Sequence, residues 1–99
     1  MERGGAVYIL TNKIHTTLYI GVSSDLQSRF FEHQKRYYPH SFSSRYNLDK
    51  LIYYEVFHSI EEAIDREKQL KGWSRKKKET LIATLNPNWI DLSPRIENW

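Results

Sequence analysis

The 99-residue chain contains no cysteine, so it can form neither a disulfide bond nor a thiolate metal site. Its four histidines do not occur at the close spacing of zinc ligands, which argues against a structural zinc ion. It has no apolar run long enough to span a membrane and no signal-peptide pattern near Met1. From these absences we expect a cytoplasmic protein that does not bind membranes.

The rest of the composition supports a single small domain. Hydrophobic residues make up 39% of the chain and aromatic residues 14%, which is enough for one compact core. The net charge of +3 is only mildly basic, so the positions of the charged residues are more informative than their sum.

Two short apolar runs, at 6–10 and 18–22, indicate β-strands joined by a polar segment. So short a connection favours an antiparallel hairpin, because a parallel pair needs a long crossover. Side chains alternate along a strand, so Tyr8 and Tyr19 emerge together if the other faces build one core. Core packing is the ordinary role of a strand tyrosine, but Gly21 in the second run also indicates close approach of another group.

Residues 24–33 predict a helix whose apolar anchors are Leu26 and Phe30. Arg29 and His33 are four residues apart and fall on the same side of this helix. They are either an exposed pair or part of a site. The following segment, 35–50, indicates a long loop that combines aromatic residues with the cations Lys35 and Arg36. Such a loop is either an ordinary surface or a contact for a nucleic-acid strand.

A third strand is predicted at 51–57, followed by a helix over 60–71 that begins at the capping residue Ser59 and stops at Gly72. Glu67 lies at the centre of the apolar stripe of this helix. A carboxylate in that position must be paired, bind a metal or line a cleft, because burying it alone is costly. A salt bridge to an arginine such as Arg29 is the alternative to a functional role.

A basic segment opens the next predicted helix, over 75–85, which ends at Asn86-Pro87. Cations at a helix start oppose the helix dipole, so their placement does not serve helix stability. They are either a solvated charge run or a surface that follows phosphates. The candidate nucleic-acid-binding residues are Lys35, Arg36, Arg66, Lys71, Arg75, Lys76, Lys77 and Lys78.

The C-terminal residues are predicted to divide into two parts. Trp89, Ile90 and Leu92 fold back onto the core, and residues 93–99 form a loose tail. The domain is therefore expected to span 5–92.

The segment Ala6-Val7-Tyr8, followed after ten residues by Tyr19-Ile20-Gly21, resembles the paired motif that names the GIY-YIG nucleases. The second half matches outright, whereas Ala6 and Val7 stand where glycine and isoleucine are usual. The chain is most similar to the small stand-alone bacterial members of the family. The resemblance implies an α/β (α+β) fold with a three-stranded antiparallel sheet flanked by helices, in the order β-β-α-β-α-α.

Further residues agree with this resemblance. Arg29 lies ten residues after Tyr19, where the family has an essential arginine, and His33 holds the place of a site residue one turn later. The run EAIDREKQLKGWS resembles the segment in which Glu67 would be the metal ligand. Asn86 is the candidate for the family asparagine. Val22 departs from repair-type relatives, which carry a lysine there.

The resemblance implies a metal-dependent endonuclease that hydrolyses phosphodiester bonds in DNA, with a role in repair or processing of DNA structures. One Mg²⁺ or Mn²⁺ ion would be bound by Glu67, and Arg29 would hold the scissile phosphate. Tyr8, Tyr19 and His33 would orient or deprotonate the attacking water. The expected partner is nucleic acid, DNA in preference to RNA, with a partner protein as one route to target selection.

Two alternatives remain open at the level of sequence. The first is a catalytically weak or inactive domain of the same fold that binds nucleic acid without cutting it. The second is a structural adaptor for other proteins, which leaves the position of Glu67 in an apolar stripe unexplained.

Overall fold

The computed structural model describes residues 4–35, 47–97 and 99, with the side chains of residues 32–35 excepted. The strands are β1 (Gly5–Thr11), β2 (Leu18–Ser23) and β3 (Lys50–Phe57), and the helices are α1 (Leu26–Lys35), α3 (Ile60–Lys71), α4 (Arg75–Leu85) and α5 (Ser93–Ile96). The predicted α+β class and the antiparallel hairpin are confirmed.

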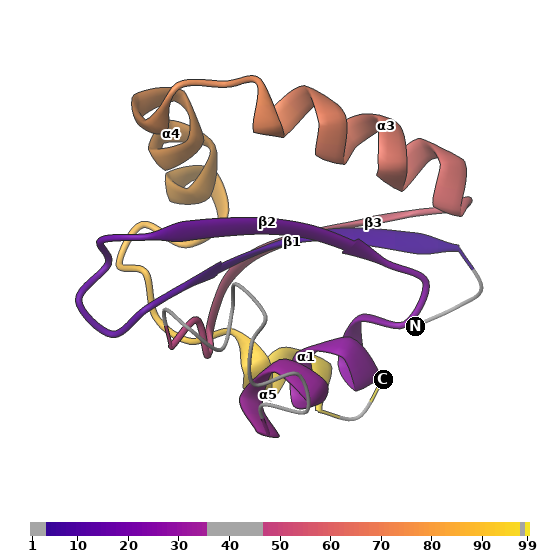
Figure 1. The fold of residues 1–99 in the computed structure, drawn as a ribbon, viewed down its shortest axis with the longest axis horizontal. Coiled ribbons are helices and arrows are strands. Elements are labelled where there is room, and N and C mark those ends of the chain that lie inside the picture. The colour runs from indigo at the N-terminus through magenta and orange to yellow at the C-terminus, as the bar shows by residue number, and fades with distance from the viewer. Residues whose placement is uncertain (1–3, 36–46, 98) are drawn as a thin grey trace.

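The sheet has the order β2-β1-β3, with both pairs antiparallel. Helices α3 and α4 lie over one face and α1 and α5 over the other, as Figure 1 shows. Because β1 is central and covered on both sides, all seven of its residues are buried. The alternation of a strand then supplies one core to each face.

Two apolar clusters result, one on each face of the sheet. The cluster under α1 and α5 consists of Ala6, Tyr8, Leu10, Leu26, Phe30, Leu48, Leu51, Leu92 and Ile96. The cluster under α3 and α4 consists of Val7, Ile9, Ile20, Ile52, Tyr53, Ala63, Leu70 and Ile82.

Helix α3 begins and ends at its predicted capping residues, and α4 begins at a serine cap that was not predicted. The Ser59 hydroxyl accepts a hydrogen bond from the Glu62 N–H at 3.2 Å, and Gly72 closes α3. The Ser74 hydroxyl accepts one from the Lys77 N–H at 3.2 Å and so begins α4. The predicted ranges 60–71 and 75–85 are therefore confirmed.

The prediction of a loose tail is wrong for residues 93–96 and 99, which the structure describes as packed. Residues 93–96 form α5, Ile96 is fully buried, and the Trp99 ring meets Tyr54 edge-on with centroids 5.2 Å apart. The reason is that α1 is short and covers only part of its sheet face, so the C-terminal residues complete the apolar cover. Ile90, predicted to fold back, is 56% exposed.

No described helix is long and apolar enough to cross a membrane.

Replacing Ile96 by alanine tests this assignment of the C-terminus. Since the side chain is fully buried in the α1-side cluster, Ile96→Ala should lower the free energy of unfolding by about 2–5 kcal/mol. Chemical denaturation measures the change, with the exposed Arg95→Ala as a control expected to stay within about 0.5 kcal/mol. Equal effects of the two substitutions would show that residues 93–99 do not belong to the core.

Candidate active site

Three of the predicted site residues come together on the α1 face of the sheet. The rings of Tyr8 and Tyr19 lie on neighbouring strands with centroids 6.3 Å apart. The Tyr8 hydroxyl forms hydrogen bonds with the side chains of Arg29, from α1, and Tyr19. Strand alternation and helix periodicity thus place these groups as predicted.

Gly21 makes this arrangement possible. It is the partner of Tyr8 in the β1–β2 ladder. A Cβ atom on Gly21 would lie 2.4 Å from both Cζ and the hydroxyl oxygen of Tyr8. The ring of Tyr8 therefore crosses over β2, and its hydroxyl reaches the edge strand of the sheet. The predicted close approach at Gly21 is confirmed, and the approaching group is Tyr8 itself.

Burial raises the pKa of Tyr8 above its ordinary value, and the neighbouring Tyr19 adds to the effect against the opposing influence of Arg29. Tyr8 is therefore neutral at physiological pH. A neutral hydroxyl can donate a hydrogen bond but cannot act as a general base. The geometry favours Tyr8 as a group that orients its neighbours, and leaves the half-buried Tyr19 nearer to solvent.

Glu67 lies in a different layer from this cluster, because α3 covers the opposite face of the sheet (Figure 1). Its side chain is 17% exposed, in agreement with its place in the apolar stripe. The Nζ atom of Lys71 lies 3.5 Å from the Glu67 carboxylate. The ion-pair partner of Glu67 is therefore a lysine and not an arginine, which was the alternative suggested by the sequence. Among described residues, the structure therefore brings Tyr8, Tyr19 and Arg29 together and holds Glu67 across the sheet.

The direction of Glu67 follows from its neighbour Arg66. Arg66 reaches Glu55 on β3, with its Nε 3.0 Å from the carboxylate. Successive helical residues are about 100° apart, and Ala63 and Leu70 point down to the sheet. On the surface of α3, Glu67 and Arg66 lie on opposite sides of the line through Ala63 and Leu70. Since Arg66 faces β3, Glu67 faces β2. Strand β2 is one of the two edge strands, so Glu67 and the Tyr8 hydroxyl approach the β2 edge of the sheet from opposite faces.

The side chains present fit a metal ion that takes few protein ligands. Within the described part of the chain, no group of three or more His, Cys, Asp or Glu residues could enclose an ion. The Glu67 carboxylate is half-buried, and its polar partner there is the lysine at 3.5 Å. A hard cation that keeps most of its waters requires one or two carboxylates, so Glu67 is a suitable single ligand.

Asn86 has a structural explanation. It is 3% exposed, and its amide N–H groups donate to the carbonyl oxygens of Ile52 at 3.1 Å and Ile90 at 2.8 Å. Its side-chain oxygen accepts from the Ile90 N–H at 3.1 Å. These bonds build the turn after α4, and we leave Asn86 out of the proposed site. The side chain of His33 lies outside the described residues.

Some of the cations predicted to contact phosphate already have a partner within the protein, and others are exposed to solvent. Arg66 is held by Glu55, whose second oxygen also accepts from the Tyr53 hydroxyl at 2.5 Å. Lys77 places its Nζ 4.1 Å from the centroid of the Trp73 ring, while Lys76 is exposed. The candidates Lys35 and Arg36 lie outside the described side chains.

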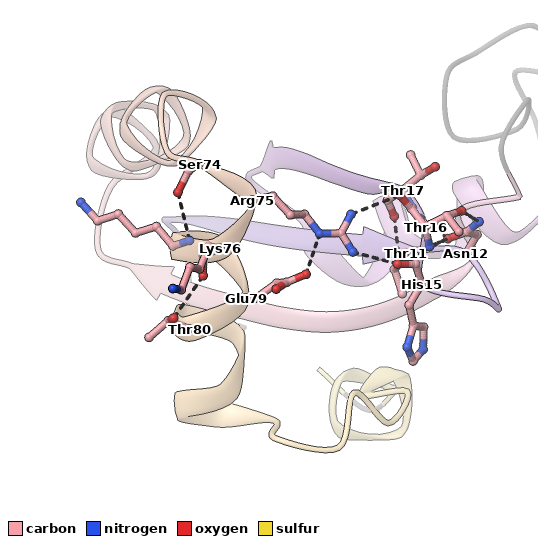
Figure 2. A network of polar contacts seen from close by, with 11 residues as sticks. Thr11, Asn12, His15, Thr16, Thr17, Ser74, Arg75, Lys76, Glu79 and Thr80 are labelled. Carbon is pink, nitrogen blue, oxygen red and sulfur yellow. Dashed lines mark hydrogen bonds and ion pairs between the residues drawn. The ribbon is translucent and has the colours of Figure 1, made fainter.

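Arg75 fastens α4 to the hairpin, as Figure 2 shows. Its guanidinium donates to the backbone oxygens of His15 at 2.8 Å and Thr16 at 3.1 Å, and to Glu79 at 2.9 Å. The basic start of α4 therefore has a tertiary reason. No sequence pattern signals this tether, because its acceptors on the hairpin are main-chain atoms.

Comparison with known proteins agrees with the geometry. Residues 4–80 match the model of the GIY-YIG catalytic domain. The chain belongs to the GIY-YIG family. It is 30% identical over 82 residues to a UPF0213 protein of Bacillus pumilus (strain SAFR-032), covering 83% of each chain.

One solved structure is similar to this chain in fold. The solution NMR structure of a UPF0213 protein from Bacillus halodurans matches with a TM-score of 0.56 at 28% identity, covering 86% of this chain and 88% of that one. The UPF0213 name states no activity, so the comparisons indicate a nuclease superfamily and not a particular reaction.

Gly21→Ala tests the packing of Tyr8 over β2. The added methyl group would collide with the Tyr8 ring, so we expect a loss of about 1–3 kcal/mol in unfolding free energy, measured by chemical denaturation. Gly72→Ala is the matched control: its Cβ would find the nearest atom at 3.5 Å and its φ is −82°. This control should be neutral or stabilise by up to about 1 kcal/mol. A Gly21→Ala protein as stable as the control would refute the close approach.

Proposed function

We propose that this GIY-YIG protein is a metal-dependent endonuclease that hydrolyses phosphodiester bonds in DNA, in the repair or processing of DNA structures. The observation that carries the proposal is the cluster of Tyr8, Tyr19 and Arg29 beside the edge strand β2. Glu67 faces the same strand from the other side of the sheet. Phosphodiester hydrolysis needs an activated water, charge stabilisation on the phosphoryl oxygens and a neutralised leaving group. The side chains at this edge can supply the first two.

Arg29 is the group best suited to the scissile phosphate. A guanidinium presents a planar fork of N–H donors that matches two phosphate oxygens. Its hydrogen bond with the buried Tyr8 hydroxyl fixes the orientation of the fork before substrate arrives. Tyr19, which is half-buried, would contact the attacking water, with His33 as the predicted second contact.

Glu67 would hold the metal ion, in agreement with its family position. When bound, Mg²⁺ or Mn²⁺ supplies Lewis-acid polarisation and lowers the pKa of coordinated water. Lys71 is the partner of the carboxylate in this structure. With an ion held by Glu67, the ammonium of Lys71 would be available to a phosphate. The side chain of Lys71 is 56% exposed, so its ammonium can leave the carboxylate without first being uncovered.

The Glu67–Lys71 pair also supports a second candidate, a domain that binds nucleic acid without cutting it. Here the lysine would satisfy the carboxylate permanently, and no ion would be needed. Both candidates share a DNA partner in preference to RNA. Both also leave target choice to DNA structure or to a partner protein, since no base-reading motif was identified.

Glu67→Gln separates these candidates. If Glu67 binds the catalytic ion, the substitution should lower cleavage about 100-fold or more, because it removes the charge that holds the ion. Cleavage is measured with Mg²⁺ or Mn²⁺ on single-stranded, duplex, flap and branched DNA, and on the RNA equivalents.

The control for this test is Asp65→Asn, which makes the same charge change at an exposed position of α3. It should retain wild-type cleavage. Both variants should melt close to the wild type, since Glu67→Gln removes only an ion pair with a lysine. Wild-type protein that binds but cuts none of these substrates would favour the binding domain.

The cations at the start of α4 can be tested together. Replacing Lys76, Lys77 and Lys78 by glutamine should weaken DNA binding and reduce the slope of log K against log salt, by about 0.9 for each phosphate that is no longer neutralised. Fluorescence anisotropy measures both. Replacing the same three lysines by arginine keeps their charges and should leave the slope unchanged. A triple glutamine variant with the wild-type slope would show that this surface is only solvated.

A further inference from the structure

An open groove of about 370 Å³ lies at the end of the sheet where the hairpin, the start of α4 and the segment after α4 meet. It is lined by His15, Arg75, Glu79, Pro87, Asn88 and Trp89. None of these belongs to the Tyr8–Tyr19–Arg29 cluster. The volume falls within the range of small-molecule sites in proteins.

Each wall of the groove is a loop organised by one asparagine side chain. In the hairpin, the Asn12 oxygen accepts from the N–H groups of Thr16 at 2.9 Å and Thr17 at 3.1 Å. In the segment after α4, the Asn86 side chain closes the turn onto Ile90 in the same way. Both loops are therefore preformed, which reduces the entropy lost when a ligand binds.

Each loop also presents one ring from a left-handed backbone conformation. His15 has φ 59° and Trp89 has φ 52°. A bulky residue rarely adopts this region, and such conformations concentrate at ligand sites. The two rings face each other with centroids 4.9 Å apart, and the Arg75 guanidinium carbon lies 5.8 Å from the Trp89 ring.

The charge in this region is positive on the hairpin side. The Nζ atom of Lys50 is 2.9 Å from Nε2 of His15. Partial burial, followed by the charges of Lys50 and Arg75, lowers the pKa of His15. Glu79 is the acidic group of the lining, and its carboxylate is already engaged by Arg75 at 2.9 Å. Because Arg75 and Glu79 compensate each other, an anion beside His15 would gain Lys50 as its cationic neighbour.

We propose that this groove binds one unpaired nucleotide of the nucleic-acid strand, with its base on the Trp89 ring and its phosphate toward His15 and Lys50. An aromatic ring stacks on any base, and the amide of Asn88 offers a donor and an acceptor to a base edge. The inference rests on the nucleic-acid partner of the proposed function but not on cleavage.

The groove is also placed to act together with the tyrosine cluster. The hairpin that carries His15 continues directly into β2 (Leu18–Ser23), whose second residue is Tyr19. A strand held at Trp89 would thus continue toward the edge of β2. This geometry favours substrates with a single-stranded segment, such as flaps, over blunt duplexes.

The test is the binding of a fluorescein-labelled 12-nucleotide oligothymidine and of a blunt 12-base-pair duplex, measured by anisotropy in EDTA so that no cleavage occurs. Trp89→Leu should weaken single-strand binding about tenfold, which is about 1.4 kcal/mol, and duplex binding less than twofold. Trp73→Leu is the matched control, because Trp73 also contacts cations but lies outside the groove. It should change single-strand binding less than twofold.

Two further measurements guard against misfolding of Trp89→Leu. His15→Asn removes the imidazole but tolerates the left-handed conformation, and it should weaken single-strand binding threefold or more. In the wild-type protein, thymidine 5′-monophosphate should shift the indole N–H signal of Trp89 in a ¹H–¹⁵N spectrum and leave that of Trp73 in place.

Unchanged affinities in both groove variants, with an unmoved Trp89 signal, would overturn the inference even if the protein cleaves DNA. Variants that impair only self-association or the binding of another protein would overturn it too. Trp89-dependent strand binding by a protein that cuts nothing would sustain it while removing the proposed nuclease activity.

Discussion

Burial of the central strand β1 on both faces is the constraint on which the other features depend. A strand covered on two sides must be apolar at nearly every position, yet one of its positions carries Tyr8, whose hydroxyl needs partners. Because Gly21 has no side chain, the Tyr8 ring can cross β2, and Arg29 and Tyr19 supply hydrogen bonds to the Tyr8 hydroxyl. The same burial that stabilises the sheet therefore orients the arginine of the candidate site.

Local patterns were sufficient to predict most of the fold. Alternation fixed which residues of the hairpin share a face, and the caps at Ser59 and Gly72 fixed the ends of α3, because both effects act within a few residues. The placement of Tyr8 and Tyr19 on one face of the sheet followed from the same alternation. The inward position of Glu67 followed from helix periodicity and agrees with its low exposure.

Long-range contacts account for what local patterns did not predict. Periodicity shows that Glu67 points inward but not which face of the sheet α3 will cover, so its separation from Arg29 could not be foreseen. Arg75 binds main-chain oxygens of the hairpin, and a main-chain acceptor has no residue signature. Ile96 is a lone apolar residue in a polar stretch, and only the uncovered part of the sheet explains its burial.

The C-terminal residues that cover the sheet also affect the part of the chain that matches the GIY-YIG family. The match to the GIY-YIG catalytic domain ends at residue 80, whereas Ile82, Leu92 and Ile96 contribute to the two cores beyond that point. A protein that shared only residues 4–80 would expose apolar surface beneath the strand that carries Tyr8. Residues outside the match therefore help to determine how rigidly the tyrosine of the family motif is held in this chain.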